Sequence, residues 1–170
     1  KLHQLESHGH SISKIELVVV GGTFPFMPDE YQLEFVKGCF DALNTLGGKR
    51  DFSSTLEQAK KFNETSKSRC VGLTVETKPD YCKQKQVKLL LGLGVTRVEI
   101  GVQSLRDNVY RAVNRGHTLK DVIESFRIAR DAGCKIVAHM MPGLPNTTLE
   151  NDINDFKTLF YHSSFKPDMI

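Results

Sequence analysis

The sequence predicts an α/β fold, a partial parallel (βα) barrel, and two observations support this prediction. Strand-like apolar runs lie at residues 14–22, 69–76, 97–103 and 135–141, and segments with helical periodicity separate them. Connections of that length, with helices inside them, join parallel strands through crossovers. Because a whole barrel takes about 250 residues, this chain is expected to hold about four to five of the strands.

Three helices are predicted from their start signals. The segments 54–57 and 147–150 are each interpreted as a capping box, and Thr118 as the cap of a helix that Gly133 ends. Residues 28–68, with two helical segments, form a candidate insertion between the first two strands. The side chains expected on the apolar faces of the last two helices are Leu119, Val122, Ile123, Phe126 and Ala129, and then Ile153, Phe156 and Phe160.

Polar and apolar side chains alternate along the predicted strands. One face is apolar and suited to packing against helices, whereas a parallel sheet buried on both faces would be apolar throughout. The other face, the lumen in a barrel, is therefore expected to meet water or a polar ligand. An open sheet with one wet face is the alternative. The polar side chains of this face are Thr74, Glu76, Glu99, Gln103 and His139.

Candidate ligand-binding residues follow the first two strands. Gly21, Gly22 and Thr23 offer bare backbone and one hydroxyl, although a glycine pair after a strand is also a common turn. Glu76 can accept hydrogen bonds from both hydroxyls of a ribose. Its alternative role is as an ion-pair partner of Arg97 or Lys135.

Similar candidates follow the third and fourth strands. The amide of Gln103 and the guanidinium of Arg115 suit an amino-acid carboxylate, unless Arg115 lies in solvent on a helix-ending turn. The segment 140–145 contains two prolines and a glycine, which predicts a rigid loop. All these residues lie where barrel enzymes place their sites, at the carboxyl ends of parallel strands.

Composition and cysteine spacing set further limits. The chain has 39% hydrophobic residues, 25% charged residues and a net charge of +3, which is typical of a soluble globular protein. The apolar run 17–20 is too short to span a membrane. The cysteines form no CxxC pair, so no zinc site or iron–sulfur cluster is expected from this segment alone, and the expected compartment is reducing and intracellular. They are Cys39, Cys70, Cys82 and Cys134.

Positive charge is concentrated in the segment 49–88, which holds ten Lys and Arg residues against five Asp and Glu residues. Such a segment can attract the phosphate backbone of a nucleic acid. A solvated, lysine-rich face is the alternative interpretation.

Five motifs, occurring in one order over essentially the whole chain, together resemble the radical-SAM domain of the catalytic subunit of Elongator. They are Gly-Gly-Thr-Phe at 21–24, Glu-Thr-Lys-Pro-Asp-Tyr-Cys at 76–82, Val-Glu-Ile-Gly-Val-Gln-Ser at 98–104, Asn-Arg-Gly-His-Thr at 114–118 and Ala-His-Met-Met-Pro-Gly-Leu-Pro-Asn at 138–146. This resemblance implies a cytoplasmic tRNA-modifying enzyme that transfers an acetyl group from acetyl-CoA to the wobble uridine. It also implies S-adenosylmethionine, a [4Fe-4S] cluster, and tRNA and other Elongator subunits as partners.

The resemblance also implies roles for individual residues. Gly22 and Thr23 would meet the amino group of S-adenosylmethionine, and Glu76 would meet its ribose. The methionine carboxylate of S-adenosylmethionine would face Gln103 and Arg115. A match to a family lysine that contacts acetyl-CoA assigns that role to Lys14.

The resemblance further implies that residues 1–170 are an internal part of the barrel domain, with the cluster cysteines upstream and the acetyltransferase domain downstream. We therefore expect no metal ligand and no acetyl transfer from these residues alone. In radical-SAM enzymes resembling the oxygen-independent coproporphyrinogen oxidase, an aspartate takes the place of His139. The alternative functions are another enzyme of that type, or a tRNA-binding scaffold without catalysis.

Overall fold

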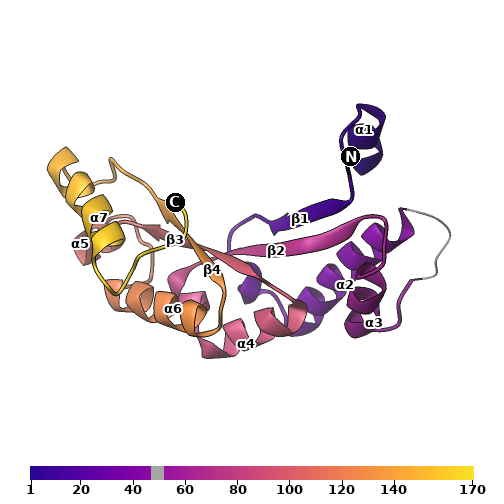
Figure 1. The fold of residues 1–170 in the computed structure, drawn as a ribbon. Helices are drawn as coiled ribbons and strands as arrows, with labels where there is room; N and C mark the ends of the chain where they lie inside the picture. Colours follow the sequence, from indigo (N-terminus) through magenta and orange to yellow (C-terminus); the bar gives the residue numbers. More distant parts are fainter. Residues whose placement is uncertain (47–51) are drawn as a thin grey trace. The chain divides into compact units, whose positions relative to one another are not determined.

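The computed structural model describes residues 1–46 and 52–170, which form two compact units. The first unit comprises residues 1–18 and 27–73, and the second comprises residues 19–26 and 74–170. Elements of the first unit are α1 (Leu2–Ser7), α2 (Asp29–Thr45) and α3 (Leu56–Asn63), with β1 (Lys14–Val19) and β2 (Arg69–Thr77) at the division between the units (Figure 1). Those of the second are η1 (Phe24–Phe26), η2 (Pro79–Tyr81), α4 (Gln84–Leu93), β3 (Arg97–Gln103), α5 (Asp107–Ala112), α6 (Leu119–Asp131), β4 (Lys135–Met140) and α7 (Leu149–Tyr161).

The strands form one sheet in the order β1-β2-β3-β4. β3 pairs in parallel with both β2 and β4, which confirms the predicted crossovers. Met169 adds a parallel bridge to Val137 on β4. The parallel sheet with helical connections confirms the α/β fold and is consistent with a partial barrel.

The core of the second unit lies between the apolar face of the sheet and the helices α4 and α6, which cover that face (Figure 1). Side chains from three neighbouring strands meet in register, because Val75 pairs with Val98 and Val98 with Ile136. All three are at most 1% exposed. Burying a side chain of this size contributes about 1.5–3 kcal/mol, so this alternation holds the strands in register.

The two helical segments predicted within residues 28–68 are confirmed as the helices α2 and α3 of the first unit. Two buried amides join them to the start of β2. Asn44 donates to the carbonyl of Ala59 at 2.9 Å, and Asn63 donates to the side-chain oxygen of Asn44 at 2.9 Å. The side-chain oxygen of Asn63 accepts the backbone N–H of Cys70 at 2.6 Å.

Two of the three predicted helix caps are wrong by one residue. The N-cap of α3 is Thr55, whose hydroxyl accepts the N–H of Gln58, and that of α7 is Thr148, whose hydroxyl accepts the N–H of Asn151. In both cases two adjacent residues have hydroxyls, and the backbone direction decides which one caps. Thr118 is confirmed, and with Asp121 it forms a full capping box.

The predicted buried face of α7 is also wrong. Ile153 is 46% exposed and Phe160 is 45% exposed, whereas Asp155 and Leu159 are buried. The Asp155 carboxylate accepts the Ser104 hydroxyl and the Leu105 N–H, and it pairs with Arg106 at 3.0 Å. These donors offset the cost of burying a charge, so the helix turns a polar residue inward. On α6, Ile123 is likewise 37% exposed.

A search of the described residues finds no helix long and apolar enough to cross a membrane.

Candidate ligand-binding site at the strand ends

Two glutamates and a histidine meet on the polar face of the second unit. Glu76 on β2 and Glu99 on β3 are register partners, so their side chains leave the sheet side by side. His139 on β4 lies between them, with Nε2 3.1 Å from Glu99 Oε2 and Nδ1 3.7 Å from Glu76 Oε1. Their side chains keep 17–35% of their surface exposed, so this face is polar and accessible.

The turn after β1 reaches the same carboxylate. Glu76 Oε2 accepts the backbone N–H of Gly21 at 3.1 Å. Gly21 has φ 131° and Gly22 has φ 87°, a region that favours glycine. No atom lies within 4 Å of a Cβ built on either glycine, so a ligand can approach the bare backbone there.

Gln103 and Arg115 also meet, over the backbone of β3. Arg115 Nη2 donates to the carbonyl of Gly101 at 3.0 Å. A Cβ built on Gly101 would lie 3.0 Å from that nitrogen and 3.4 Å from Gln103 Nε2, so the guanidinium crosses the strand only because residue 101 is glycine. The same position lies 3.6 Å from the carbonyl of Thr77, next to Glu76. Gly21, Glu76, Gln103 and Arg115 are thus at one edge of the sheet.

The backbone at this edge adopts rare conformations. Gln103 has φ 70° and Asn114 has φ 51°, both unusual for residues other than glycine. The pairing of β3 with β4 is irregular between Ile100 and Gln103. Gln103 is the last residue of β3 and Asn114 precedes Arg115, and such outliers are frequent at binding sites.

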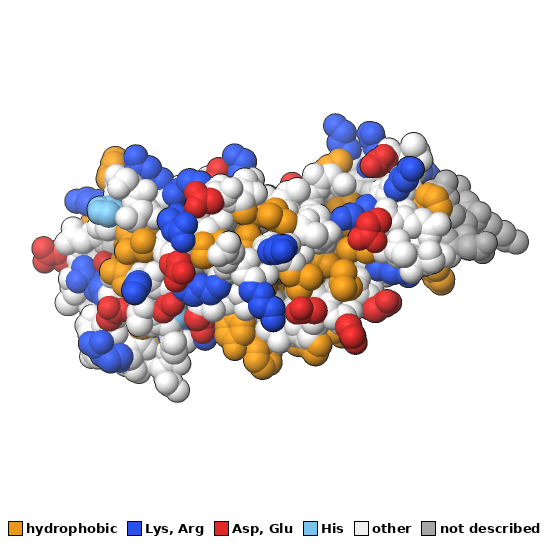
Figure 2. All heavy atoms as spheres, turned by 90° about the horizontal axis from the view of Figure 1, so that it is seen from below, with side chains coloured by type: hydrophobic (Ala, Val, Ile, Leu, Met, Phe, Trp, Pro, Cys, Tyr) orange, Lys and Arg blue, Asp and Glu red, His pale blue; other side chains and the backbone are white. Residues whose placement is uncertain are grey.

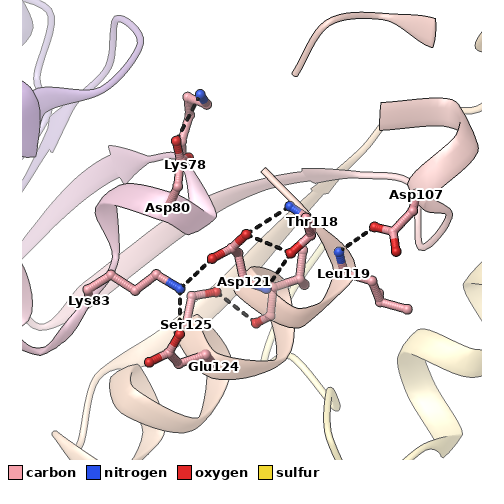
Figure 3. A network of polar contacts seen from close by, with 10 residues as sticks. Lys78, Asp80, Lys83, Asp107, Thr118, Leu119, Asp121, Glu124 and Ser125 are labelled. Atoms are coloured by element: carbon pink, nitrogen blue, oxygen red, sulfur yellow. Dashed lines mark hydrogen bonds and ion pairs between the residues drawn. The ribbon is translucent and has the colours of Figure 1, made fainter. Parts of the chain in front are cut away.

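A network of ion pairs and caps fixes the loop that carries Arg115 (Figure 3). Asp107, at the start of α5, accepts the N–H of Leu119 at 2.8 Å, so both ends of the loop are tied together. Lys83 pairs with Asp121 at 2.8 Å and with Glu124 at 2.6 Å, which ties α6 to the start of α4. Partial burial alone would raise the pKa of Asp121, but hydrogen bonds from Lys83 and Thr118 outweigh it and lower the pKa to about 2.

His117 lies within this loop and is 3% exposed. Its ring packs edge-on against Tyr110, with the centroids 4.4 Å apart. Neither ring nitrogen has a hydrogen-bond partner among the described residues. Burial, followed by the nearby charge of Arg115, lowers the pKa of His117 to about 4. The imidazole is therefore neutral at pH 7 and acts as part of the loop's packing.

The predicted site residues thus have different outcomes. Glu76, Gln103 and Arg115 come together in the second unit, and Gly22 and Thr23 follow Gly21, which contacts Glu76. Lys14 belongs to the first unit, at the exposed start of β1. The proposed pairing of Glu76 with Lys135 is wrong, because Lys135 pairs with Asp168 at 2.9 Å.

Sequence reasoning did not assign a role to Gly101, although a glycine inside a strand signals close approach of another group. It placed Glu99 on the polar face without assigning it a role in the site.

The cysteines do not form a metal centre. Cys82 and Cys134 are buried, and burial raises the pKa of Cys82 to about 12. Within residues 1–46 and 52–170, no three His, Cys, Asp or Glu side chains are grouped so as to hold a metal ion. The described cysteines therefore do not fit an iron–sulfur cluster.

The helix-covered side of the molecule shows no segregation of charge. On the face drawn in Figure 2, Lys and Arg side chains alternate with Asp and Glu side chains, with apolar ones between them. Several lysines of the basic segment 49–88 are paired, among them Lys67 with Glu6 and Lys78 with Asp80. Lys49 and Arg50 lie outside the described residues. Pairing reduces the charge that this segment offers to a phosphate backbone.

Comparison with known proteins fits this geometry. The family model described as the Radical SAM superfamily matches residues 2–159. The chain belongs to this superfamily. Its fold matches that of the archaeal Methanocaldococcus infernus Elp3 with an N-terminal deletion, with a TM-score of 0.93 and 44% identity over 99% of this chain and 39% of that chain. Coproporphyrinogen III oxidase from Escherichia coli shares the fold alone, with a TM-score of 0.58 and 16% identity over 92% of this chain and 44% of that one.

Two curated relatives have names that state an activity or an assembly. The chain is 45% identical over its full length to a "tRNA uridine(34) acetyltransferase" of Methanocaldococcus infernus, covering 31% of that protein. It is 46% identical over 99% of its length to "Elongator complex protein 3" of Homo sapiens, covering 30% of it. The resemblance found in the motifs is confirmed, and the chain spans about a third of the length of these relatives.

Proposed function

We propose that the full-length protein is a cytoplasmic tRNA-modifying enzyme that transfers an acetyl group from acetyl-CoA to the wobble uridine. The support is the 45% identity, over the whole chain, to a protein named for acetylation of uridine 34 in tRNA. Because the chain covers 31% of that relative, the acetyl transfer is proposed for the full-length protein. The similarity to Elongator complex protein 3 supports tRNA and other Elongator subunits as partners.

The part proposed for this chain is the binding of S-adenosylmethionine at the edge formed by β2 and β3. Glu76 carries the proposal, because its carboxylate lies beside the bare backbone of Gly21. Among the described residues, its other oxygen, Oε1, has no partner closer than His139 at 3.7 Å. A carboxylate oxygen in that state can accept a ribose hydroxyl. Gly22 and Thr23 would meet the ammonium group through carbonyl and hydroxyl oxygens.

Gln103 and Arg115 would bind the carboxylate of the same ligand. Arg115 has one buried N–H, at Nε, without a partner among the described residues, so the guanidinium retains donors for an anion. When bound, a [4Fe-4S] cluster would supply an electron to S-adenosylmethionine. The described cysteines do not fit that cluster, so we derive no step through it and propose that its ligands lie outside this chain.

Equilibrium binding of S-adenosylmethionine to the full-length protein tests this proposal. Glu76→Gln preserves size but removes charge, and a charge-assisted hydrogen bond contributes about 1.5–3 kcal/mol, so affinity should fall about 10- to 100-fold. Arg115→Lys should also weaken binding, because an ammonium cannot make a bidentate contact. Glu150→Gln, an exposed glutamate on α7, is the matched control. Normal binding by Glu76→Gln would rule out the ribose role.

The role of Lys14 is tested separately. Lys14→Ala should abolish hydrolysis or transfer of acetyl-CoA by the full-length protein while S-adenosylmethionine binding persists. Lys14 is exposed at the start of β1, so its removal should leave the fold unchanged. Intact acetyl-CoA chemistry in this variant would withdraw Lys14 from the site.

A further inference from the structure

The carboxylate of Glu76 lies between two groups, one of them a hydrogen-bond donor and the other a longer contact. Its Oε2 accepts the N–H of Gly21 at 3.1 Å, and its Oε1 lies 3.7 Å from Nδ1 of His139. The glycines of the turn at Gly21 and Gly22 have no side chain to fix it, and among the described residues only their chain neighbours approach the place where a Cβ would stand. The orientation of Glu76 therefore determines where the backbone of this turn lies.

His139 in turn is fixed from its other nitrogen. Its Nε2 lies 3.1 Å from Oε2 of Glu99, within hydrogen-bond distance, whereas the separation from Glu76 is longer. A close polar contact at one ring nitrogen restricts the orientation of the ring. Glu99 thus determines which edge of the imidazole faces Glu76.

The register of the sheet places the carboxylates of Glu76 and Glu99 next to each other. Glu76 and Glu99 are direct partners on adjacent parallel strands. Two carboxylates on one face of neighbouring strands repel each other, and partial burial strengthens the repulsion because the local dielectric is low. The imidazole of His139 places one ring nitrogen toward each carboxylate, and a ring N–H reduces the repulsion felt by the oxygen that it faces.

We propose that Glu99 is a positioning residue, which acts through His139 to hold Glu76 in the orientation that fixes the Gly21–Gly22 turn and leaves Oε1 free for the ligand. Glu99 itself makes no contact with that ligand. This inference rests on the proposed binding of S-adenosylmethionine at Glu76. It links four groups through successive contacts: Glu99 on β3, His139 on β4, Glu76 on β2 and the Gly21–Gly22 turn after β1.

A double-mutant cycle on the full-length protein measures the coupling between Glu99 and Glu76 in ligand binding. Glu99→Leu should weaken S-adenosylmethionine binding about 3- to 10-fold, within the range of coupling between residues in contact. In a protein that already carries Glu76→Gln, the same change should cause less than about a twofold further loss. Losses that multiply fully would mean that Glu99 acts independently of Glu76, and would overturn the proposal.

Conservative replacements separate positioning from a general effect on stability. Glu99→Gln keeps an oxygen that can accept the Nε2–H of His139, so binding should recover to within about threefold of the unsubstituted protein. His139→Leu removes the link and should reproduce Glu99→Leu, and combining the two should add nothing. If Glu99→Leu does not fold, His139→Leu takes its place in the cycle. Equal loss in Glu99→Gln and Glu99→Leu would contradict the positioning role.

Amide hydrogen exchange without ligand decides the inference even if the proposed ligand is wrong. Exchange at Gly21 should accelerate in Glu99→Leu and in Glu76→Leu to similar rates, and Glu150→Gln should leave it unchanged. Unaltered exchange at Gly21 in Glu99→Leu would overturn the inference, whatever happens to binding. If Glu76→Gln binds S-adenosylmethionine normally while the exchange result holds, only the proposed ligand fails and the positioning role remains.

Discussion

Gly101→Ala is predicted to weaken the contact with the carboxylate of S-adenosylmethionine, the proposed ligand, without disturbing contacts with its nucleoside. The added Cβ would lie 3.0 Å from Arg115 Nη2, whereas ordinary contact begins at 3.4 Å, so the guanidinium must retreat by about 0.4 Å. That retreat lengthens and weakens the 3.0 Å hydrogen bond to the carbonyl of residue 101 and displaces the guanidinium from its place over the strand. The far end of an arginine moves easily, so the free energy of unfolding should change by less than about 1 kcal/mol.

Two ligands reveal the effect of this change. S-adenosylmethionine has a carboxylate, and loss of its charge-assisted contact should weaken binding by up to about 1.5–3 kcal/mol, or about 10- to 100-fold. 5′-Methylthioadenosine has the same nucleoside without the amino-acid group, so its affinity should not change. Calorimetric titration of the full-length protein with both ligands measures the difference.

Gly92→Ala is the control for the added methyl group. Gly92→Ala, on α4, adds a Cβ with nothing within 4 Å and should leave both affinities unchanged. Equal loss for both ligands in Gly101→Ala would show that the methyl group distorts the sheet. No loss for either would show that Arg115 does not bind the carboxylate.

Three further predictions concern stability and tRNA. Burial lowers the pKa of His117 to about 4, and the unfolded value is about 6.5. The folded state thus binds fewer protons in this window, and urea unfolding should show a loss of about 2 kcal/mol between pH 7.5 and pH 5 that His117→Phe removes. Asp155→Asn leaves the charge of Arg106 without its partner and should destabilise the protein by about 3 kcal/mol in thermal unfolding. Replacing Lys60 and Lys61 by Glu should lower the slope of log tRNA affinity against log salt by about two units, and an unchanged slope would show that this face is merely solvated.

The parts of the fold that sequence predicts well depend on local periodicity. Alternation along β2 and β3 placed Val75 and Val98 on the buried face and Glu76 and Glu99 on the polar face, because side chains of a strand alternate strictly. The face of α7 could not be predicted in this way. Asp155 can be buried because three groups distant in sequence donate to it. Helical periodicity cannot predict those donors.

The sequence could predict which residues lie near the strand ends, but not the contacts that they make. Strand ends alone indicated Glu76, Gln103 and Arg115, because parallel strands bring their carboxyl ends to one edge. The position of His139 beside Glu99 depends on the register across three strands, and Gln103 follows an irregularity in the β3–β4 pairing. Neither the register nor the irregularity has a signature in one sequence, so the link from Glu99 to Glu76 required the structure.

Two strained residues and one unpaired donor occur together near the end of β3, and their coincidence supports the proposed ligand. Gln103 and Asn114 adopt positive φ, and the buried Nε of Arg115 has no partner among the described residues. Each such feature costs about 1–3 kcal/mol. The first turn of α6, on the same loop, is by contrast fully capped by Thr118 and Asp121. The N-terminus of α6 is thus capped, whereas the Nε–H of Arg115, three residues before Thr118, has no acceptor among the described residues. A ligand that supplies this acceptor should stabilise this edge of the sheet in particular.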